Sequence, residues 1–138
     1  MYLSAQERAV AAYQQMGAVT LTMQPTPQQM MLALFDALRT QLLRAQAALG
    51  RGDLALKGQA LGKAVRILEE GIRSGLDRSK DPVQVESLDQ LYRYCVARLT
   101  EANLKREEAP ISEVMNLIEP LHEAWRQVAR QPLQPQLG

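Results

Sequence analysis

The stretch that decides the fold is TPQQMMLALFDALRTQLLRAQAAL, residues 26–49. It opens with Thr26-Pro27, a hydroxyl that can cap a helix followed by a proline at the first helical position. No glycine or proline follows before Gly50. Its apolar residues recur every three or four positions, the spacing of one helix face, and they cover more than one neighbouring helix needs. The stretch therefore predicts a long amphipathic helix in an all-helical domain.

Three further long helices are predicted downstream of this stretch. The second runs from about Asp53 to Arg78, the third begins at Pro82, and the fourth extends to Arg130 with a kink expected at Pro120. Short loops between long amphipathic helices favour antiparallel neighbours. We therefore predict an all-α fold, an antiparallel up-down four-helix bundle over residues 26–130.

The two ends of the chain are predicted to lie outside this bundle. Ser4 and Glu7 form a capping box for a short additional N-terminal helix, and an extended connector follows it, so residues 1–25 form one unit. The proline-containing residues 131–138 are predicted to be a disordered tail.

Composition excludes several classes of function. The chain has 138 residues and a net charge of +1, which argues against a nucleic-acid module or docking on anionic lipid. The longest apolar run, Met30–Phe35, is too short to span or insert into a membrane. No signal peptide is visible, and a single cysteine suits a reducing cytoplasm.

Few residues suggest chemistry. Glu119 and His122 have the Glu-x-x-His spacing of di-iron bundles, but one histidine cannot complete such a site, so we expect a surface or partly buried structural histidine. Asp36, which follows an apolar run, is expected either to point to solvent or to pair with a neighbour such as Arg39 or a cation of the second helix. A polar anchor for a bound partner is the alternative role for Asp36. Cys95 is expected to be a small core residue. No cofactor is predicted.

Glycines on the second predicted helix have two interpretations. Gly58 and Gly62, like Gly71 and Gly75, have Gly-x-x-x-Gly spacing, which lets another backbone approach closely. Either the glycines allow tight packing inside the bundle, or they shape a shallow groove for a foreign helix.

Short pieces of the sequence stand in a fixed order from Tyr13 to about Val128. They are Tyr13-Gln14-Gln15, Thr26-Pro27, Leu34-Phe35-Asp36, Lys57, Lys63-Ala64, Ile67-Leu68, Gly75-Leu76-Asp77, Leu91-Tyr92-Arg93-Tyr94, Arg98-Leu99, Glu101-Ala102-Asn103, Glu113-Val114 and Glu123-Ala124-Trp125. In this order and spacing the chain resembles the FliS family of flagellar secretion chaperones. The sequence departs from the family pattern at Ala37, where the family has glycine, at Lys80–Val83, and at Pro120.

The resemblance implies a non-enzymatic chaperone. It implies binding to the C-terminal region of flagellin in the cytoplasm, protection from premature polymerisation, and delivery to the flagellar type III export gate. Apolar grooves for this cargo, and an asparagine that bonds its backbone, would draw on nine residues. These are Tyr13, Leu32, Phe35, Leu61, Ala64, Leu68, Tyr92, Ala102 and Asn103.

Two other functions remain open from the sequence. The chain is alternatively a helical adaptor that forms a homodimer through its wide apolar face without flagellin cargo. A metal-binding bundle enzyme is the third option, and the single histidine disfavours it.

Overall fold

The computed structural model describes residues 25–130, and these residues form helices without any β-strand. The four long helices are α2 (Pro27–Gly50), α3 (Leu54–Arg66), α4 (Pro82–Lys105) and α5 (Ala109–Arg130). A π-helical segment, η1 (Ile67–Ile72), and a 3₁₀ turn, η2 (Arg73–Gly75), continue α3. The predicted all-α bundle is confirmed. The helix and connector predicted for residues 1–25, and the tail at 131–138, lie outside the described residues, apart from Pro25.

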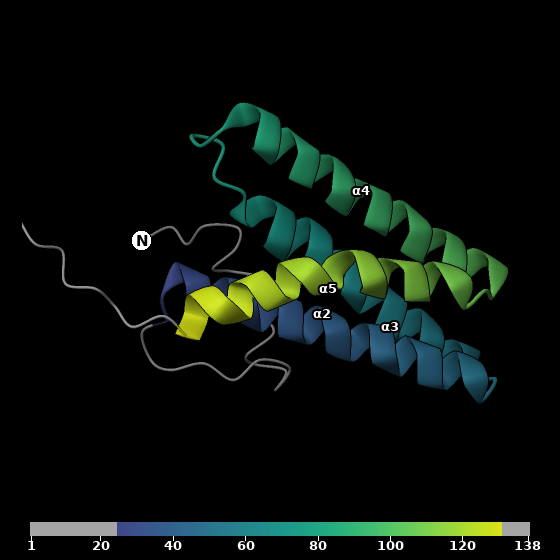
Figure 1. Cartoon of the computed structure of the whole chain (residues 1–138). Coiled ribbons are helices and arrows are strands. Elements are labelled where there is room, and N and C mark those ends of the chain that lie inside the picture. The colour runs from purple at the N-terminus through teal and green to yellow at the C-terminus, as the bar shows by residue number, and fades with distance from the viewer. Residues whose placement is uncertain (1–24, 131–138) are drawn as a thin grey trace, which may run out of the picture.

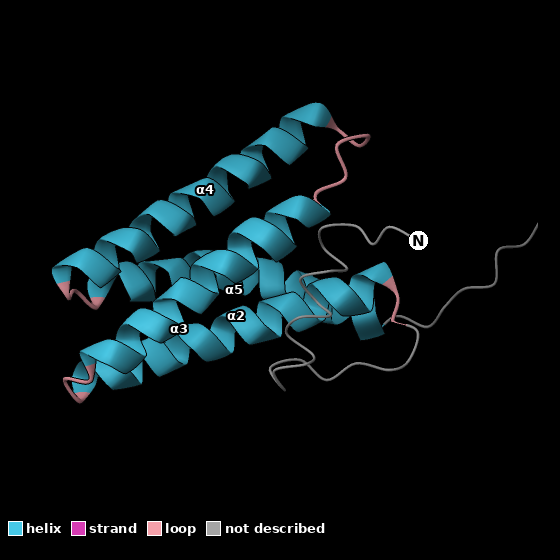
Figure 2. Cartoon of the chain, turned by 180° about the vertical axis from the view of Figure 1, so that it is seen from behind, coloured by secondary structure: helices cyan, strands magenta, loops and turns pink. Residues whose placement is uncertain are grey.

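The helices form a ring in which each long helix packs against two others. α2 contacts α3 and α5, and α4 contacts the same two helices from the opposite side. Figure 1 shows that the connections after α2 and α4 lie at one end of the bundle, whereas the connection after η2 lies at the other. Figure 2 shows the same arrangement from behind. Successive helices therefore run in opposite directions.

Side-chain caps fix where the helices begin. The Thr26 hydroxyl accepts a hydrogen bond from the Gln29 amide at 3.1 Å, and the Gln29 side chain accepts one from the Thr26 amide at 2.9 Å. The Asp53 carboxylate accepts from the Leu56 amide at 3.1 Å, and Asp81 caps α4 in the same way. These bonds satisfy amides that have no partner within the helix.

The predicted second helix is wrong in its winding and in its end. Helical structure stops at Gly75 rather than Arg78, and the winding changes from α to π to 3₁₀ within nine residues. Gly71 sits in the π segment, where a Cβ atom would lie 2.9 Å from Cδ2 of Leu34 on α2. The close approach of α2 at this glycine, and the hydrogen bonds of the Ser74 hydroxyl to the carbonyls of Glu70 and Gly71, accompany the irregular turn.

An apolar core lies between all four long helices and η1. Its largest fully buried members come from every element of the ring. They are Phe35, Leu34, Leu38, Leu42, Leu61, Ile67, Leu68, Ile72, Leu99, Ile111 and Val114, together with His122. Cys95 is buried among them, as predicted. α5 continues through Pro120, which lies on its exposed side.

A buried carboxylate ties η2 to α4. The carboxylate oxygens of Asp89 lie 2.8 Å from Nε of Arg73, 3.3 Å from Nε of Arg93 and 3.5 Å from Nη2 of Arg78. The Asp89 side chain is 7% exposed. The hydrogen bond from Arg73 lowers the pKa of Asp89 more than burial raises it. This pairing anchors η2, the irregular end of the helix that begins as α3, to α4.

Candidate binding surface

Most residues predicted to contact cargo lie inside the bundle. Six of them are at most 3% exposed in the structure. These are Phe35 on α2, Leu61 and Ala64 on α3, Leu68 on η1, and Tyr92 and Ala102 on α4. All six belong to the apolar core. They hold the helices together, and none offers a surface to a partner in this conformation.

The remaining predicted residues are placed differently. Leu32, near the start of α2, is half-buried, and Asn103, near the end of α4, is exposed. Tyr13 lies outside the described residues. Leu32 and Asn103 are at opposite ends of the bundle, because the start of α2 and the end of α4 are at opposite ends (Figure 1). Asn103 also lies at the seam between α4 and α3, so a single partner that contacts both residues must run along the bundle and around it.

Asn103 stands at the seam between α3 and α4. Its backbone carbonyl, one of the last in α4, accepts a hydrogen bond from Nζ of the buried Lys57 at 3.0 Å. Its side-chain oxygen lies 3.6 Å from the position of a Cβ atom on Gly58. The lysine satisfies a helix-end carbonyl that has no partner within α4, and a Cβ atom on Gly58 would only touch the Asn103 amide at ordinary contact distance.

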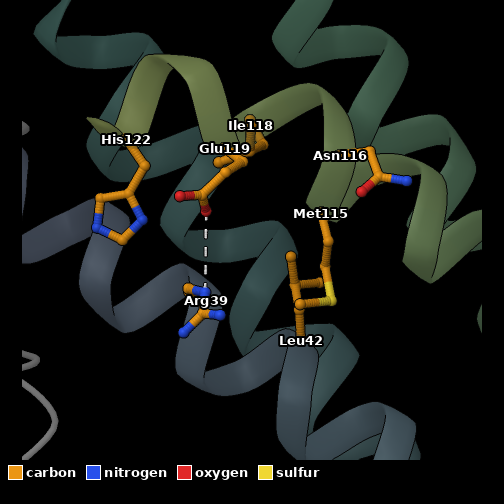
Figure 3. Close-up of a pocket in the computed structure, with 7 residues that line it drawn as sticks. All are labelled: Arg39, Leu42, Met115, Asn116, Ile118, Glu119 and His122. Atoms are coloured by element: carbon orange, nitrogen blue, oxygen red, sulfur yellow. Dashed lines mark ion pairs between the residues drawn. The ribbon is translucent and has the colours of Figure 1, made fainter. Parts of the chain in front are cut away.

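A pocket of about 200 Å³ opens between α2 and α5 (Figure 3). Its lining combines the apolar side chains of Leu42, Met115 and Ile118 with polar groups from both helices. The polar lining residues are Arg39, Asn116, Glu119 and His122. We call this the α2–α5 pocket. Apolar walls with a few polar groups are typical of sites that accept one side chain or a small ligand.

A loose ion pair joins the two helices at this pocket. Arg39 Nε and a Glu119 carboxylate oxygen are 3.9 Å apart, and both side chains are about half exposed (Figure 3). Glu119 also accepts a hydrogen bond from Arg126 at 3.0 Å, which is the main cause that lowers its pKa. Exposed pairs of this kind contribute little to stability, so the Arg39 side chain is free to exchange partners.

The neighbours named for Asp36 are not its partner. Asp36 is exposed, as one of its alternatives allowed, and its Oδ1 lies 2.6 Å from Nε2 of His122 on α5. The prediction of a surface or partly buried histidine is wrong, because His122 is 1% exposed and its ring stacks on Phe35 with the centroids 5.8 Å apart. Asp36 reaches the histidine from the exposed side of α2, so the contact depends on how the two helices pack.

The hydrogen bonds of His122 assign its tautomer. Arg126 lies 3.2 Å from Nδ1, and a guanidinium can only donate. Nδ1 is therefore the acceptor, and Nε2 carries the proton that the ring donates to Asp36. The ring is held at both nitrogens, which fixes one wall of the α2–α5 pocket.

Sequence reasoning missed the pocket itself. Met115, Glu119 and His122 follow one another at spacings of four and three, which places them on one side of α5. That spacing was weighed only as a metal motif, and the partner face on α2 was not paired with it. Within residues 25–130 there is no cluster of three or more His, Cys, Asp or Glu side chains that suits a metal ion.

Of the glycines on the second predicted helix, Gly71 fits the interpretation of tight packing inside the bundle, and bundle packing does not require a glycine at position 62. Gly71 packs tightly against α2, whereas a Cβ atom on Gly62 would meet no atom within 4 Å. Burial raises the pKa of Cys95 to about 11, which keeps the thiol protonated and unreactive. None of the helices between residues 25 and 130 is long and apolar enough to cross a bilayer.

Comparison with known proteins places the whole bundle in one group. Residues 9–132 match the family model described as flagellar protein FliS. The flagellar secretion chaperone FliS of Salmonella typhimurium is 37% identical over 120 residues, which is 87% of this chain and 89% of that protein. The protein of the same name from Escherichia coli is 32% identical over 91% of this chain and 92% of its own length. FliSB of Pseudomonas aeruginosa is 30% identical over 86% of this chain and 93% of its own.

Proposed function

This chain belongs to the FliS family of flagellar secretion chaperones, and from that premise we propose that it binds the C-terminal region of flagellin. Binding takes place in the cytoplasm, prevents premature polymerisation of the subunit and aids its delivery to the flagellar type III export apparatus. The observation that carries the proposal is the match to the family model along the whole bundle. The family is one of chaperones, so no catalytic step is involved.

The shape of the described surface supports a helical cargo. An amphipathic helix binds by laying apolar side chains, spaced one turn apart, into a groove of its partner. The α2–α5 pocket offers one such recess, with Leu42, Met115 and Ile118 on its walls. Leu32 lies on α2, ten residues before Leu42, and is half-buried. We propose that cargo contacts this side of the bundle.

The nine candidate residues divide into two groups under this proposal. Leu32 and Asn103 are accessible and contact cargo directly, and Tyr13 keeps its predicted role as a contact. The six buried residues act indirectly, because they hold the helices that shape the surface. A cargo that contacts both accessible residues gains area from several shallow contacts rather than from one deep site.

Replacement of Leu32 by aspartate tests the cargo surface. We expect Leu32→Asp to weaken binding of a flagellin C-terminal peptide about tenfold, because a charge replaces an apolar contact. Titration calorimetry measures the affinity, and circular dichroism checks that the variant stays helical. Val83→Asp is the matched control, because Val83 is apolar, 76% exposed and not a candidate contact. Equal losses in both variants, or no loss in Leu32→Asp, would contradict the assignment.

The oligomeric state separates the chaperone from an adaptor that only dimerises. We expect any homodimer of the free protein to give way to a complex of one chain with one flagellin peptide, because both use the same apolar side of the bundle. Light scattering with and without the peptide measures this directly. A homodimer that persists when the peptide is added, and that does not bind the peptide, would favour the adaptor.

A further inference from the structure

The charge of the bundle is unevenly divided between its two hairpins. Residues 26–75 contain seven lysines and arginines and four carboxylates, a net charge of +3. Residues 76–130 contain eight lysines and arginines and ten carboxylates, a net charge of −2. The near-neutral total therefore conceals a basic hairpin, formed by α2 and α3 with η1 and η2, packed on an acidic one.

Three cations of the basic hairpin have no partner among the described residues. Arg44, Arg51 and Lys63 form no ion pair or side-chain hydrogen bond within residues 25–130, and all three are exposed. By contrast, Arg93 and Arg98 on α4 are each held by carboxylates. The carboxylates of the basic hairpin are already engaged, because they cap α3 or pair with His122, Arg66 and Arg73.

Helix register places Arg44 and Lys63 at the same level of the hairpin. α2 and α3 run antiparallel and meet where Leu34 packs on Gly71. Arg44 lies ten residues beyond that contact on α2, and Lys63 lies eight residues before it along the third helix. At about 1.5 Å per residue these positions are about 15 Å and about 12 Å from the contact, so they differ by about 3 Å along the bundle.

Both side chains stand at the margin of the face that joins the two helices. Arg44 is four residues before the buried Ala48, which shares a side of α2 with Leu34. Lys63 is four residues before the buried Ile67. Arg51, at the end of α2, continues the row seven residues after Arg44, which is about 10.5 Å. We call Arg44, Arg51 and Lys63 the basic seam.

We propose that the basic seam is a docking surface for an acidic segment of a protein partner, separate from the α2–α5 pocket. The argument is charge complementarity: Arg44 and Arg51 are about 10.5 Å apart along the bundle, with Lys63 beside Arg44, and carboxylates at positions i, i+4 and i+7 of a helix span the same distance. The exposed residues between Arg44 and Arg51, Ala47 and Gly50, are small and leave a flat floor.

A protein partner fits this surface better than a membrane. A helix that lies on a membrane combines its cations with large apolar side chains that enter the acyl region. The large apolar residues that are exposed in the described structure are Leu43, Leu54, Val83, Tyr94, Leu104 and Val128. Of these, Leu43 and Leu54 are close in sequence to residues of the seam, but at 42% and 37% exposure each stays more than half covered, so the surface offers cations without a large apolar anchor.

The test uses a synthetic helical peptide with glutamates at i, i+4 and i+7 and a second peptide with glutamine at those positions. We expect the full chain to bind the glutamate peptide at low salt and the glutamine peptide at least tenfold more weakly. The variant Arg44→Gln/Arg51→Gln/Lys63→Gln should lose at least tenfold in affinity for the glutamate peptide. Circular dichroism confirms that the variant is folded.

A second variant separates a built surface from net charge. Lys80→Gln/Arg106→Gln/Arg130→Gln removes the same charge from other exposed positions and should bind the glutamate peptide like the natural sequence. An equal loss in this control overturns the proposal. Binding to vesicles with 30% phosphatidylserine but not to the peptide also overturns it, in favour of a membrane. Displacement of the peptide by a saturating flagellin C-terminal peptide would overturn the separation of the two surfaces.

Discussion

At the residue scale, Asp89 shows how one side chain organises the end of a helix. Its carboxylate is nearly buried and pairs with three arginines, one from η2, one from the loop that precedes α4 and one from α4 itself. Removal of the charge leaves those arginines facing a neutral amide. Because the arginines are partly exposed and screened by solvent, we expect Asp89→Asn to lower the free energy of unfolding by about 1–2 kcal/mol at pH 7.

The same carboxylate predicts a pH dependence. Its pKa is lowered in the folded chain, so its contribution is complete above the pKa of an unfolded aspartate, about 4, and is lost as the pH falls through the lower folded value. The difference in the free energy of unfolding between the natural chain and the Asp89→Asn variant should therefore become smaller below about pH 4. Urea unfolding at pH 7, 5 and 3.5 measures it, and a difference that stays constant would show that the carboxylate is not held by the arginines.

His122 and Asp36 mark the limit of prediction at this scale. The sequence shows that each lies on a helix, but their contact joins residues 86 positions apart, and it depends on the angle at which α2 and α5 pack. Within one helix the apolar period is enough to separate neighbouring residues. Tyr92 shares a face of α4 with Cys95 and Leu99 and is buried, whereas Tyr94 is 45% exposed.

At the element scale, the boundaries of α2 and α4 were predictable because threonine, aspartate and proline cap them locally. The end of the helix that begins as α3 was not predictable, since the π winding of η1 has no local signal in the sequence. The change of winding depends on the contact between Gly71 and Leu34, which exists only in the folded bundle. The same dependence on tertiary packing explains why core and surface residues of the apolar faces were confused: an apolar period does not reveal which face a neighbour covers.

Gly62 on α3 and Gly71 on η1 predict opposite effects of an alanine substitution on stability. Gly62→Ala should raise the free energy of unfolding by about 0.5–1 kcal/mol, because alanine favours the helix and the added Cβ meets open space. Gly71→Ala should lower it by about 1–3 kcal/mol, because the added Cβ overlaps the buried Leu34 side chain. Urea unfolding compares the two variants, and each serves as the control for the other. A stabilised Gly71→Ala would mean that α2 yields at this point without cost.

At the scale of the whole molecule, the fold and the family could be predicted from the sequence, but the binding surface could not. The order of short pieces along the chain carried the family, and matches to known proteins confirm it. Six of the nine candidate residues are core residues, because the patterns that mark a family include those that hold its fold. The basic seam appears only when α2 and α3 are placed side by side, since the overall charge of +1 does not reveal it.

The ring of His122, which is hydrogen-bonded at both nitrogens, gives this protein a built-in reporter of pocket occupancy. The chain has one histidine, and its Nε2 proton is held against Asp36 where solvent scarcely reaches the ring. Such a proton exchanges slowly and yields a single, isolated nuclear magnetic resonance line. Because the ring also lines the α2–α5 pocket, the position of that line records occupancy of the pocket without any label or substitution.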